Sequence, residues 1–531
     1  MKRRAFLTSS MILGAGMVLP AKWAAAQSRG DSLRVLSEGA ANSFESFSVG
    51  INRNSLQISW NIYDRLVKFA YKAREDGTAY YDYFDIRPEL AESYEVSDDK
   101  TSITFHLRKD AVFHDGAPVT AEDVKWSLDR VVSSPIGLSQ FGTGSMTETS
   151  QFVVVDAHTV RIDLPQPDRF ALPNLALTYP IIVNSKLALQ HATTEDPFAS
   201  EWLKMNPAGG GAYRIARAQV GERILFERFE DWKSGPLPAF RQVLWQTVPA
   251  AESRVASLLK GDADVAQDLP PKDVMRLLEN TDVKVVGVPT SSFQFIGMNT
   301  QLAPFDDVRV RQAIAYALPY DAMFQTALFG RGQPLFGGEP GAPETTTFPQ
   351  PLGYSTDLEK AKALLAEAGL PDGFETTFQF ELSVATVAEP VALLLQESLG
   401  RIGIRVTIDK VPAGQLGTLL QDKKVPFYFE GSTSYLADPD YFFRVFYYGD
   451  TRWNFGSYQN PEFISLVDAT RYETDQAAYD SSVRRMIELV KDEVPIILLW
   501  HPSLDTGMAK SVEGYSYTFH RQLDFRPLTR D

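Results

Sequence analysis

The side chains best suited to chemistry are scattered along the chain and form no recognisable catalytic motif. The sequence has six histidines and no cysteine. It lacks a serine nucleophile elbow, a His-Glu-x-x-His zinc motif, a phosphate-binding glycine loop and a dinucleotide-binding fingerprint. The missing cysteine also excludes thiolate metal sites and cysteine nucleophiles. We therefore predict that the protein is not an enzyme and holds no cofactor.

Metal binding and acid–base catalysis are the two chemical alternatives that remain. The histidines show no short ligand spacing; they are His106, His114, His158, His191, His501 and His520. Neutral imidazole suits nickel, but a strand or loop position explains each histidine more simply, so no metal is predicted. The stretch Asp438-Pro439-Asp440 offers a carboxylate pair, although Asp-Pro-Asp is more typical of turn chemistry.

The stretch 435–455, rich in aromatic and polar residues, is the best candidate for a ligand-binding surface. A cleft for polar organic ligands needs flat apolar faces and a few oriented polar groups. At this density most of the aromatic residues must belong to the core. The residues predicted to line the cleft are Tyr435, Asp438, Trp453 and Asn454, together with Glu38, which directly follows the first expected strand.

The elements that would position these residues alternate between strands and helices. We expect strands at 33–36 and 404–408, helices at 55–66, 308–317 and 358–368, and hairpins at 94–107 and 152–164. Thr120 and Asp123 resemble a capping box at the start of a further helix. The chain is expected to cross between two α/β lobes near 288–293 and to return near 495–502, where an apolar run predicts a buried strand.

The first 26 residues are typical of a secretory signal. A basic start at 2–4 precedes an apolar run at 6–19, and three alanines at 24–26 offer a cleavage site. The Arg-Arg-x-Phe-Leu order matches a twin-arginine signal, and the run is too short to span a membrane, which needs about 20 residues. Because the chain has no cysteine for acylation, we expect a soluble periplasmic protein and not a lipoprotein.

The charge of the chain argues against nucleic acid as a partner. Removing the signal takes away four basic residues and no acidic one, so the net charge moves from −15 to −19. No run of lysine and arginine appears in the remaining sequence. Acidity of this kind is more often a solubility feature than a ligand preference, so it does not identify the ligand.

Several segments form an ordered set that spans nearly the whole mature chain. They are Arg87-Pro88-Glu89-Leu90-Ala91-Glu92-Ser93-Tyr94, Thr104-Phe105-His106-Leu107-Arg108, residues 112–124 (VFHDGAPVTAEDV), Phe295-Ile296-Gly297-Met298-Asn299-Thr300, residues 304–314 (PFDDVRVRQAI), Ala363-Leu364-Leu365-Ala366-Glu367-Ala368-Gly369, Asp438-Pro439 and Tyr458-Gln459-Asn460-Pro461. Together these segments resemble the dipeptide, oligopeptide, nickel and opine group of bacterial extracellular solute-binding proteins, family 5.

The resemblance implies an α/β, two-lobed periplasmic binding protein fold of type II, cluster C, with an extra subdomain in the first lobe. On this basis we place the first lobe at 27–290, its extra subdomain at about 65–190, the second lobe at 291–497 and a return to the first lobe at 498–531. The resemblance also implies a monomer that closes on a small organic ligand around a hinge and docks on an inner-membrane ABC permease.

Departures from the family bear on the ligand. In peptide-binding relatives an aspartate shortly before Asp-Pro holds the peptide's amino group, and here Tyr435 takes its place. The segment that supplies an arginine to the peptide carboxylate in dipeptide-binding relatives corresponds to 383–390, which has no arginine or lysine. The glycine loop at 209–211 also lacks the usual Thr and Pro, which either alters the cleft or is only loop drift.

These departures disfavour a free dipeptide. The leading hypothesis is an importer receptor for an oligosaccharide or an opine-like sugar conjugate. A longer peptide is the first alternative, since main-chain hydrogen bonds along a cleft can carry its affinity without end-charge recognition. A periplasmic hydrolase of the same shape is the alternative of another class, and it would need a nucleophile or metal site that the sequence does not show.

Overall fold

The structure of the protein is a computed structural model. It describes residues 29–46, 50–75, 77–338, 345–412, 414–518 and 522–531. The predicted signal segment, residues 1–26, and His520 lie outside the described residues.

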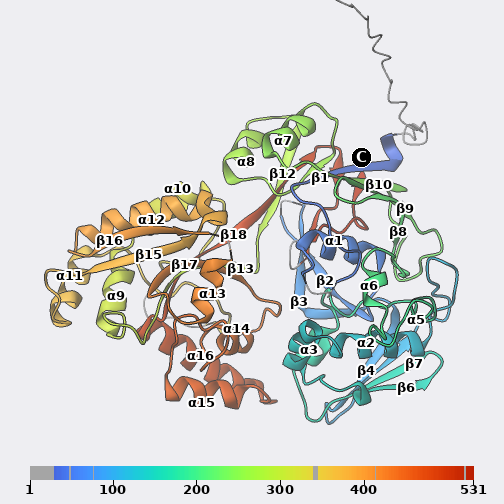
Figure 1. Ribbon diagram of the computed structural model, residues 1–531, viewed down its shortest axis with the longest axis horizontal. Coiled ribbons are helices and arrows are strands. Elements are labelled where there is room, and N and C mark those ends of the chain that lie inside the picture. Colours follow the sequence, from blue (N-terminus) through green and yellow to red (C-terminus); the bar gives the residue numbers. More distant parts are fainter. Residues whose placement is uncertain (1–28, 47–49, 76, 339–344, 413, 519–521) are drawn as a thin grey trace, which may run out of the picture.

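Figure 1 shows two bodies side by side, the first built mainly from the N-terminal half of the chain and the second mainly from the C-terminal half. The elements of the first body, with α7, α8, β11 and β12 above the junction, are β1 (Ser32–Ser37), α1 (Arg53–Ile62), β2 (Val67–Ala73), β3 (Ala79–Pro88), β4 (Ala91–Val96), β5 (Ser102–Leu107), α2 (Ala121–Val132), α3 (Pro135–Phe141), β6 (Phe152–Asp156), β7 (Thr159–Asp163), α4 (Ala171–Asn174), α5 (Ser185–Leu189), α6 (Ser200–Leu203), β8 (Tyr213–Gln219), β9 (Arg223–Arg228), β10 (Gln242–Thr247), α7 (Ala251–Leu259), β11 (Val265–Ala266), α8 (Pro271–Leu278) and β12 (Val283–Pro289).

The second body begins at β13 and ends where the chain turns back. Its elements are β13 (Ser292–Met298), α9 (Val308–Ala317), α10 (Tyr320–Leu328), β14 (Gly332–Pro334), α11 (Leu358–Glu367), β15 (Glu375–Glu381), α12 (Ala385–Gly400), β16 (Arg405–Val411), α13 (Gln415–Gln421), β17 (Phe427–Thr433), α14 (Pro439–Phe446), α15 (Pro461–Thr470) and α16 (Gln476–Glu493). The remaining strands are β18 (Ile496–Ala509), β19 (Val512–Glu513), β20 (Ser516–Tyr517) and β21 (Thr529–Arg530).

Strand β18 connects the two bodies. Its first half pairs antiparallel with β13 of the second body, and its second half pairs antiparallel with β12 and β11 beside the first body. One continuous sheet therefore runs from β16 through β18 to β1 and on to β8. The predicted buried strand at 495–502 is confirmed as the first half of β18, where the apolar run Ile496–Trp500 lies in the interior. The expected crossing near 288–293 falls between β12 and β13.

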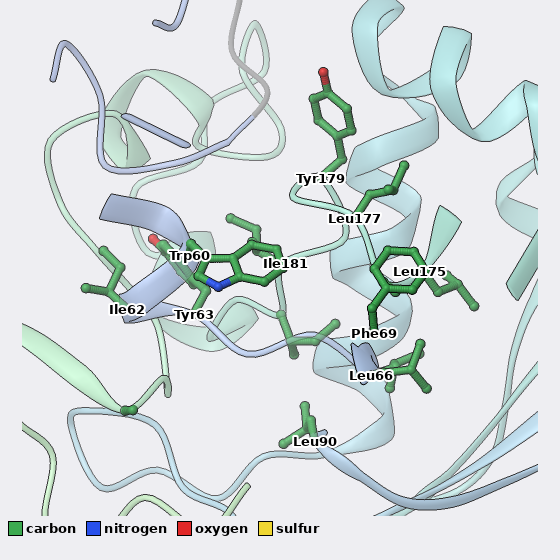
Figure 2. Close-up of a cluster of buried hydrophobic side chains, with 14 of the residues drawn as sticks. Trp60, Ile62, Tyr63, Leu66, Phe69, Leu90, Leu175, Leu177, Tyr179 and Ile181 are labelled. Carbon is green, nitrogen blue, oxygen red and sulfur yellow. The ribbon is translucent and has the colours of Figure 1, made fainter. Parts of the chain in front are cut away.

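Each body has its own apolar interior. Figure 2 shows part of the first core, where Trp60 and Tyr63 from the end of α1 pack with Leu90 and with Leu175, Leu177 and Ile181. The second body has two clusters, one between its sheet and α9 to α12 and one beneath α14 to α16. The first core also takes in Leu436 and Tyr441, which come from the second body, so the two bodies are in apolar contact there.

Local sequence patterns predicted several of these elements correctly. The strands at 33–36 and 404–408, the two hairpins and the helices after Asp307 and at 358–368 are all present as β1, β16, β4–β5, β6–β7, α9 and α11. The Asp123 carboxylate accepts the backbone N–H of Thr120 at 3.0 Å, as expected at the start of α2.

The helix predicted at 55–66 was too long at its C-terminal end. The chain leaves α1 at Tyr63, whose backbone is extended. Beyond it, the backbone N–H of Arg65 donates to the Glu89 carboxylate at 2.9 Å instead of to a helical carbonyl. The buried contact between Arg65 and Glu89 thus ends the helix before its apolar spacing ends.

Helix α12 with the turn before it, Leu382–Gly400, is long and apolar enough to span a membrane by length and composition alone. Its Val391, Leu395 and Leu399 are buried in the second body and pack with α10 and the sheet. This packing accounts for the apolar residues on the inner face of the helix, whereas Leu393 is 53% exposed.

The glycine loop at 209–211 is a packing element of the first body. The N–H of Gly211 donates to the Ile62 carbonyl at 3.0 Å, and the His114 ring lies 2.9 Å from the Gly211 carbonyl. None of these glycines lines the large cavity described below. The Thr and Pro that relatives usually have in this loop are therefore absent from a buried turn and not from the wall of that cavity.

We expect Gly211→Ala to destabilise the protein by about 2 kcal/mol or more, because overpacking against an immobile neighbour costs 1–3 kcal/mol. A Cβ at Gly211 would lie 2.5 Å from the carbonyl carbon of Ile62, which is backbone and cannot rotate away. Thermal and denaturant unfolding measure the loss. Gly417→Ala, in α13 with no heavy atom within 4 Å of the added Cβ, is the control and should be neutral or slightly stabilising. Equal unfolding midpoints for the two variants would contradict the packing argument.

Candidate ligand-binding site

A cavity of about 780 Å³ lies between the two bodies. This falls within the range of sites that bind small organic molecules, roughly 300–1,000 Å³. Its walls come from segments far apart in the chain. The lining includes β2 and β3, residues 169–173, the crossing at 289–291, the loop at 346–349, the starts of α14 and α16, and His501 on β18.

Aromatic side chains form much of the cavity wall. Strand β3 contributes Tyr80, Tyr81, Tyr83 and Phe84, and the second body contributes Phe348, Phe442 and Tyr479. The rings of Tyr80 and Tyr81 stack at a centroid distance of 4.9 Å. The Phe84 side chain is 78% exposed, which is unusual for a ring of this size. It therefore offers an open apolar face to a ligand.

Charged side chains in the cavity wall balance one another. Lys72, Arg74 and Arg169 stand against Asp82, Asp438 and Asp480. Lys72 pairs with Asp82 at 2.7 Å, and the Asp480 carboxylate accepts from Gln476 at 2.7 Å. This balance favours a ligand without a large net charge, in agreement with the view that the acidity of the chain does not set the ligand.

Asp438 combines a structural role with a place in the cavity. It is the N-cap of α14, and its Oδ1 accepts the backbone N–H of Asp440 at 3.0 Å and the hydroxyl of Tyr479. Asp440 is fully buried and pairs with Arg444 at 3.0 Å. The Asp-Pro-Asp stretch is thus a helix start, which agrees with its interpretation as local backbone chemistry.

Burial raises the pKa of Asp438 to about 6, although the Tyr479 hydroxyl and the Arg169 guanidinium oppose the shift. A carboxyl whose pKa is raised in the folded state binds its proton more tightly there than in the unfolded chain. Its ionisation therefore costs stability at pH values above about 6, and this cost disappears as the pH falls toward 4.

We expect Asp438→Asn to be more stable than the wild type at pH 7.5 by up to about 3 kcal/mol, the free energy that corresponds to raising a carboxyl pKa from 3.8 to about 6. That advantage should shrink between pH 6 and pH 4. Other acids with raised pKa, such as Asp64, are common to both proteins and cancel in the difference. Denaturant unfolding of both proteins at pH 4.5 and 7.5 measures it, and a stability difference that does not change with pH would contradict the burial argument.

His501 presents a hydrogen-bond acceptor to the cavity. Its Nδ1 lies 2.8 Å from the Ser292 carbonyl, which can only accept, so Nδ1 carries the hydrogen. Burial lowers the pKa of His501, which keeps the ring neutral and leaves Nε2 without a hydrogen. In the described part of the chain, no group of three or more His, Cys, Asp or Glu side chains is placed to hold a metal ion.

Polar contacts join the two bodies along one side of the cavity. Arg471 pairs with Asp168 at 2.9 Å, with side chains only 9% and 0% exposed. The hydroxyl of Tyr179 donates to that of Tyr435 at 2.7 Å. Arg169 Nη2 donates to the Glu473 carbonyl at 3.1 Å. These contacts hold residues 168–179 of the first body against residues 435–473 of the second.

Of the five predicted ligand contacts, the structure places only Asp438 in the cavity wall. Tyr435 is partly buried against Tyr179 beside the cavity. Trp453 is 44% exposed and packs on Phe455, at a ring-centroid distance of 5.6 Å, outside the cavity lining.

The other two predicted residues hold local backbone. Asn454 is buried, and its Nδ2 donates to the carbonyls of Gly449 at 2.8 Å and Tyr458 at 3.0 Å. Glu38 is exposed, and its backbone N–H donates to Asp268 at 3.2 Å. Ligand contact by Glu38, Tyr435, Trp453 and Asn454 stays a prediction, and the lining of this cavity does not support it.

Sequence reasoning missed Arg169, Tyr479 and the tyrosines of β3. The run Tyr80-Tyr81-Asp82-Tyr83-Phe84 has a higher aromatic density than 435–455 and was the one signal available. Arg169 and Tyr479 lie in unremarkable local sequence, so only the packing of the two bodies brings them to Asp438.

Comparison with known proteins identifies the family of this chain. The sequence model of the bacterial extracellular solute-binding proteins, family 5 (Middle), matches residues 85–454. The chain belongs to this family. Members are non-enzymatic transport receptors, so the hydrolase alternative falls away. The chain is the periplasmic solute-binding component of an ABC importer, which binds a small ligand and interacts with an ABC permease.

Similar proteins differ in what they bind. The dipeptide-binding protein of Escherichia coli K12 is 27% identical, with 96% of this chain and 97% of that protein covered. The periplasmic binding protein DppA from Helicobacter pylori, solved with the peptide STSA, has a TM-score of 0.73 and 25% identity over 94% of this chain and 98% of its own. AgaA from A. tumefaciens R10, solved with agropinic acid, has a TM-score of 0.71 and 27% identity over 94% and 99%. These neighbours confirm the two-lobed type II fold and leave the ligand open.

Proposed function

We propose that this receptor captures an oligosaccharide or an opine-like sugar conjugate in the cavity between the bodies, by lobe closure, and delivers it to the permease. The observation that carries the proposal is the composition of the cavity wall, which offers aromatic faces and balanced charges. Rings with a few polar groups between them suit a ligand with many hydroxyls and little net charge.

The position of Tyr435 supports the same proposal. In this sequence it replaces the aspartate that holds the amino group of a peptide in relatives, and its hydroxyl is engaged by Tyr179. A tyrosine hydroxyl has no charge to attract an ammonium group. The segment 383–390 also has no cation for a peptide carboxylate. A dipeptide would therefore lose both of its charged anchors.

An oligopeptide is the second candidate, because the cavity has room for more than two residues. Residues of the crossing 289–291 and of the loop 346–349 line the cavity. The N–H groups of Thr290 and Ser291 already donate to the Pro502 carbonyl and the Tyr517 hydroxyl, so an extended peptide would bond to backbone carbonyls there. This alternative needs no end-charge recognition, so the loss of the two anchors does not weigh against it.

The lobe boundaries belong to the same proposal. We place the hinge where the chain crosses at residue 290 and returns at 498, with the first lobe at 27–290, its subdomain at about 65–190 and the second lobe at 291–497. Export by a twin-arginine signal at 1–26 and a monomeric state complete the proposal.

The test is native mass spectrometry of the mature protein purified from its own periplasm, followed by release and identification of the bound molecule. A recovered sugar or opine-like conjugate is the expected result. A mixture of peptides would overturn the proposal in favour of the oligopeptide alternative.

A further inference from the structure

Two oppositely charged side chains in the cavity wall, Arg169 and Asp438, lie near each other but too far apart for a direct hydrogen bond. Arg169 Nη1 and Asp438 Oδ2 are 3.8 Å apart, with side chains 21% and 10% exposed. A charge-assisted hydrogen bond between them would need about 2.7–2.9 Å. Among the described residues, neither of these two atoms makes any other hydrogen bond.

Each partner is fixed by its remaining contacts. Asp438 Oδ1 is committed to the Asp440 N–H and to the Tyr479 hydroxyl. The Arg169 guanidinium lies 3.4 Å over the Tyr479 ring, and its Nη2 donates to the Glu473 carbonyl. These contacts orient both groups and leave Arg169 Nη1 and Asp438 Oδ2 separated by 3.8 Å.

A ligand hydroxyl suits this gap better than a ligand carboxylate or ammonium group. It can donate its hydrogen to Asp438 Oδ2 and accept from Arg169 Nη1 at the same time. A hydroxyl oxygen about 2.8 Å from each atom is compatible with their separation of 3.8 Å. A ligand carboxylate would face Asp438, and a ligand ammonium would face Arg169, so each gains one partner and is repelled by the other.

We infer that Arg169 and Asp438 anchor a hydroxyl of the ligand, and that the ligand is recognised through a polyhydroxylated portion, a sugar or sugar-alcohol chain. The inference rests on the proposed function and names its ligand class. The ring of Tyr479 beside the pair and the exposed face of Phe84 offer apolar surface to the C–H faces of such a chain. His501 Nε2 is a further acceptor for a hydroxyl in the same cavity.

The experiment compares two synthetic probes by isothermal titration calorimetry on the mature protein. One is N-(1-deoxy-D-mannityl)-L-glutamate, and the other is N-hexyl-L-glutamate, which has the same chain length and charges without the hydroxyls. The readout is the ratio of the two Kd values. We expect the wild type to prefer the mannityl probe by about tenfold or more, because a hydrogen bond to a charged group is worth that much when its partner is otherwise left unpaired.

Two variants test the anchor separately. Asp438→Asn keeps an oxygen for the Asp440 N–H, and Arg169→Met keeps an unbranched apolar side chain but removes the guanidinium over Tyr479. Each should reduce the probe ratio about tenfold, and the double variant should lose little more, since one hydroxyl bridges both groups. Asp372→Asn, an exposed acid far from the cavity lining, is the matched control and should keep the wild-type ratio. Circular dichroism establishes that each variant is folded.

The outcomes separate the inference from the proposed function. If both variants keep the wild-type ratio of Kd values, Arg169 and Asp438 do not anchor the hydroxyl, although the ligand would still be polyhydroxylated. A wild type that binds both probes equally would overturn the polyhydroxylated class. Binding of the peptide Ser-Thr-Ser-Ala with no binding of either probe would overturn the proposed function itself.

Discussion

Replacing Glu89 with alanine is expected to lower the free energy of unfolding by about 3–5 kcal/mol, the range found when one partner of a buried ion pair is removed. Glu89 is fully buried and pairs with Arg65 at 3.0 Å and with Arg526 at 2.6 Å. Burial alone would raise the pKa of Glu89, but the two guanidinium groups outweigh it and hold the pKa below its ordinary value.

The loss is large because the cations cannot reach water. The Arg65 side chain is 0% exposed, lies 3.8 Å over the Trp60 ring and has two nitrogens without a hydrogen-bond partner among the described residues. Arg526 retains its ion pair with Asp524 at 2.7 Å, so the loss of Glu89 mainly leaves the buried Arg65 without a counter-charge. The carboxylate also accepts the backbone N–H at which the chain leaves α1, so the turn loses its partner as well.

Denaturant unfolding followed by circular dichroism measures this prediction. Glu92→Ala, on the exposed side of the same segment, is the matched control and should change stability by less than about 0.5 kcal/mol. Glu89→Gln should fall between the two, because it keeps an acceptor for the backbone N–H of Arg65 but no charge. A Glu89→Ala variant as stable as Glu92→Ala would show that the cluster is not a structural centre of the first body.

Replacing Arg471 with alanine is expected to weaken ligand binding at least tenfold without unfolding the protein. Its ion pair with Asp168 is almost fully buried and joins the two bodies. Removing Arg471 leaves the Asp168 carboxylate buried without its cation, and burial already raises the pKa of Asp168. Unlike Glu89, the Asp168 carboxylate can regain water if the two bodies move apart. The free-energy cost of its unpaired charge therefore shifts the equilibrium from the closed form toward the open form.

A cost of about 3 kcal/mol corresponds to a shift of more than a hundredfold in that equilibrium. The apparent affinity for the ligand falls in proportion to the population of the binding-competent form. A tenfold increase in Kd is therefore the smallest effect that we expect. Small-angle X-ray scattering should show a larger radius of gyration, and calorimetry should show the weaker Kd for whichever probe binds the wild type.

The control for this prediction is Arg485→Ala. Arg485 pairs with Glu462 and Glu488 on the surface of one body, and exposed ion pairs contribute little. An Arg471→Ala variant with unchanged affinity and an unchanged radius of gyration would show that the contacts at 168–179 and 435–473 do not hold the closed form.

Elements with a strong local pattern were predictable because their cause is local. The alternating residues of β5, the aspartate N-cap of α9 and the apolar run in β18 each specify one structure within a few residues. Helix α1 shows where this fails. Its apolar spacing continues to Leu66, but the helix ends at Ile62 because Glu89 takes the backbone N–H of Arg65.

The site was predicted less well for a related reason. In the aromatic stretch 435–455, which side chains face the cavity depends on how α14 packs, and no short-range pattern encodes that. Asp438 lies in the cavity wall because it caps the helix that starts beside the cavity. Asn454 holds a turn instead, and Trp453 lies outside the cavity lining.

The sequence by itself determined the family, the absence of cysteine chemistry and those strands and helices that have a strong local pattern. These follow from composition and from patterns a few residues long. Only the tertiary structure decided the cavity, the pairing of Tyr179 with Tyr435 and the gap between Arg169 and Asp438. Those features join residues hundreds of positions apart, and their distances are set by the packing of two bodies across β18.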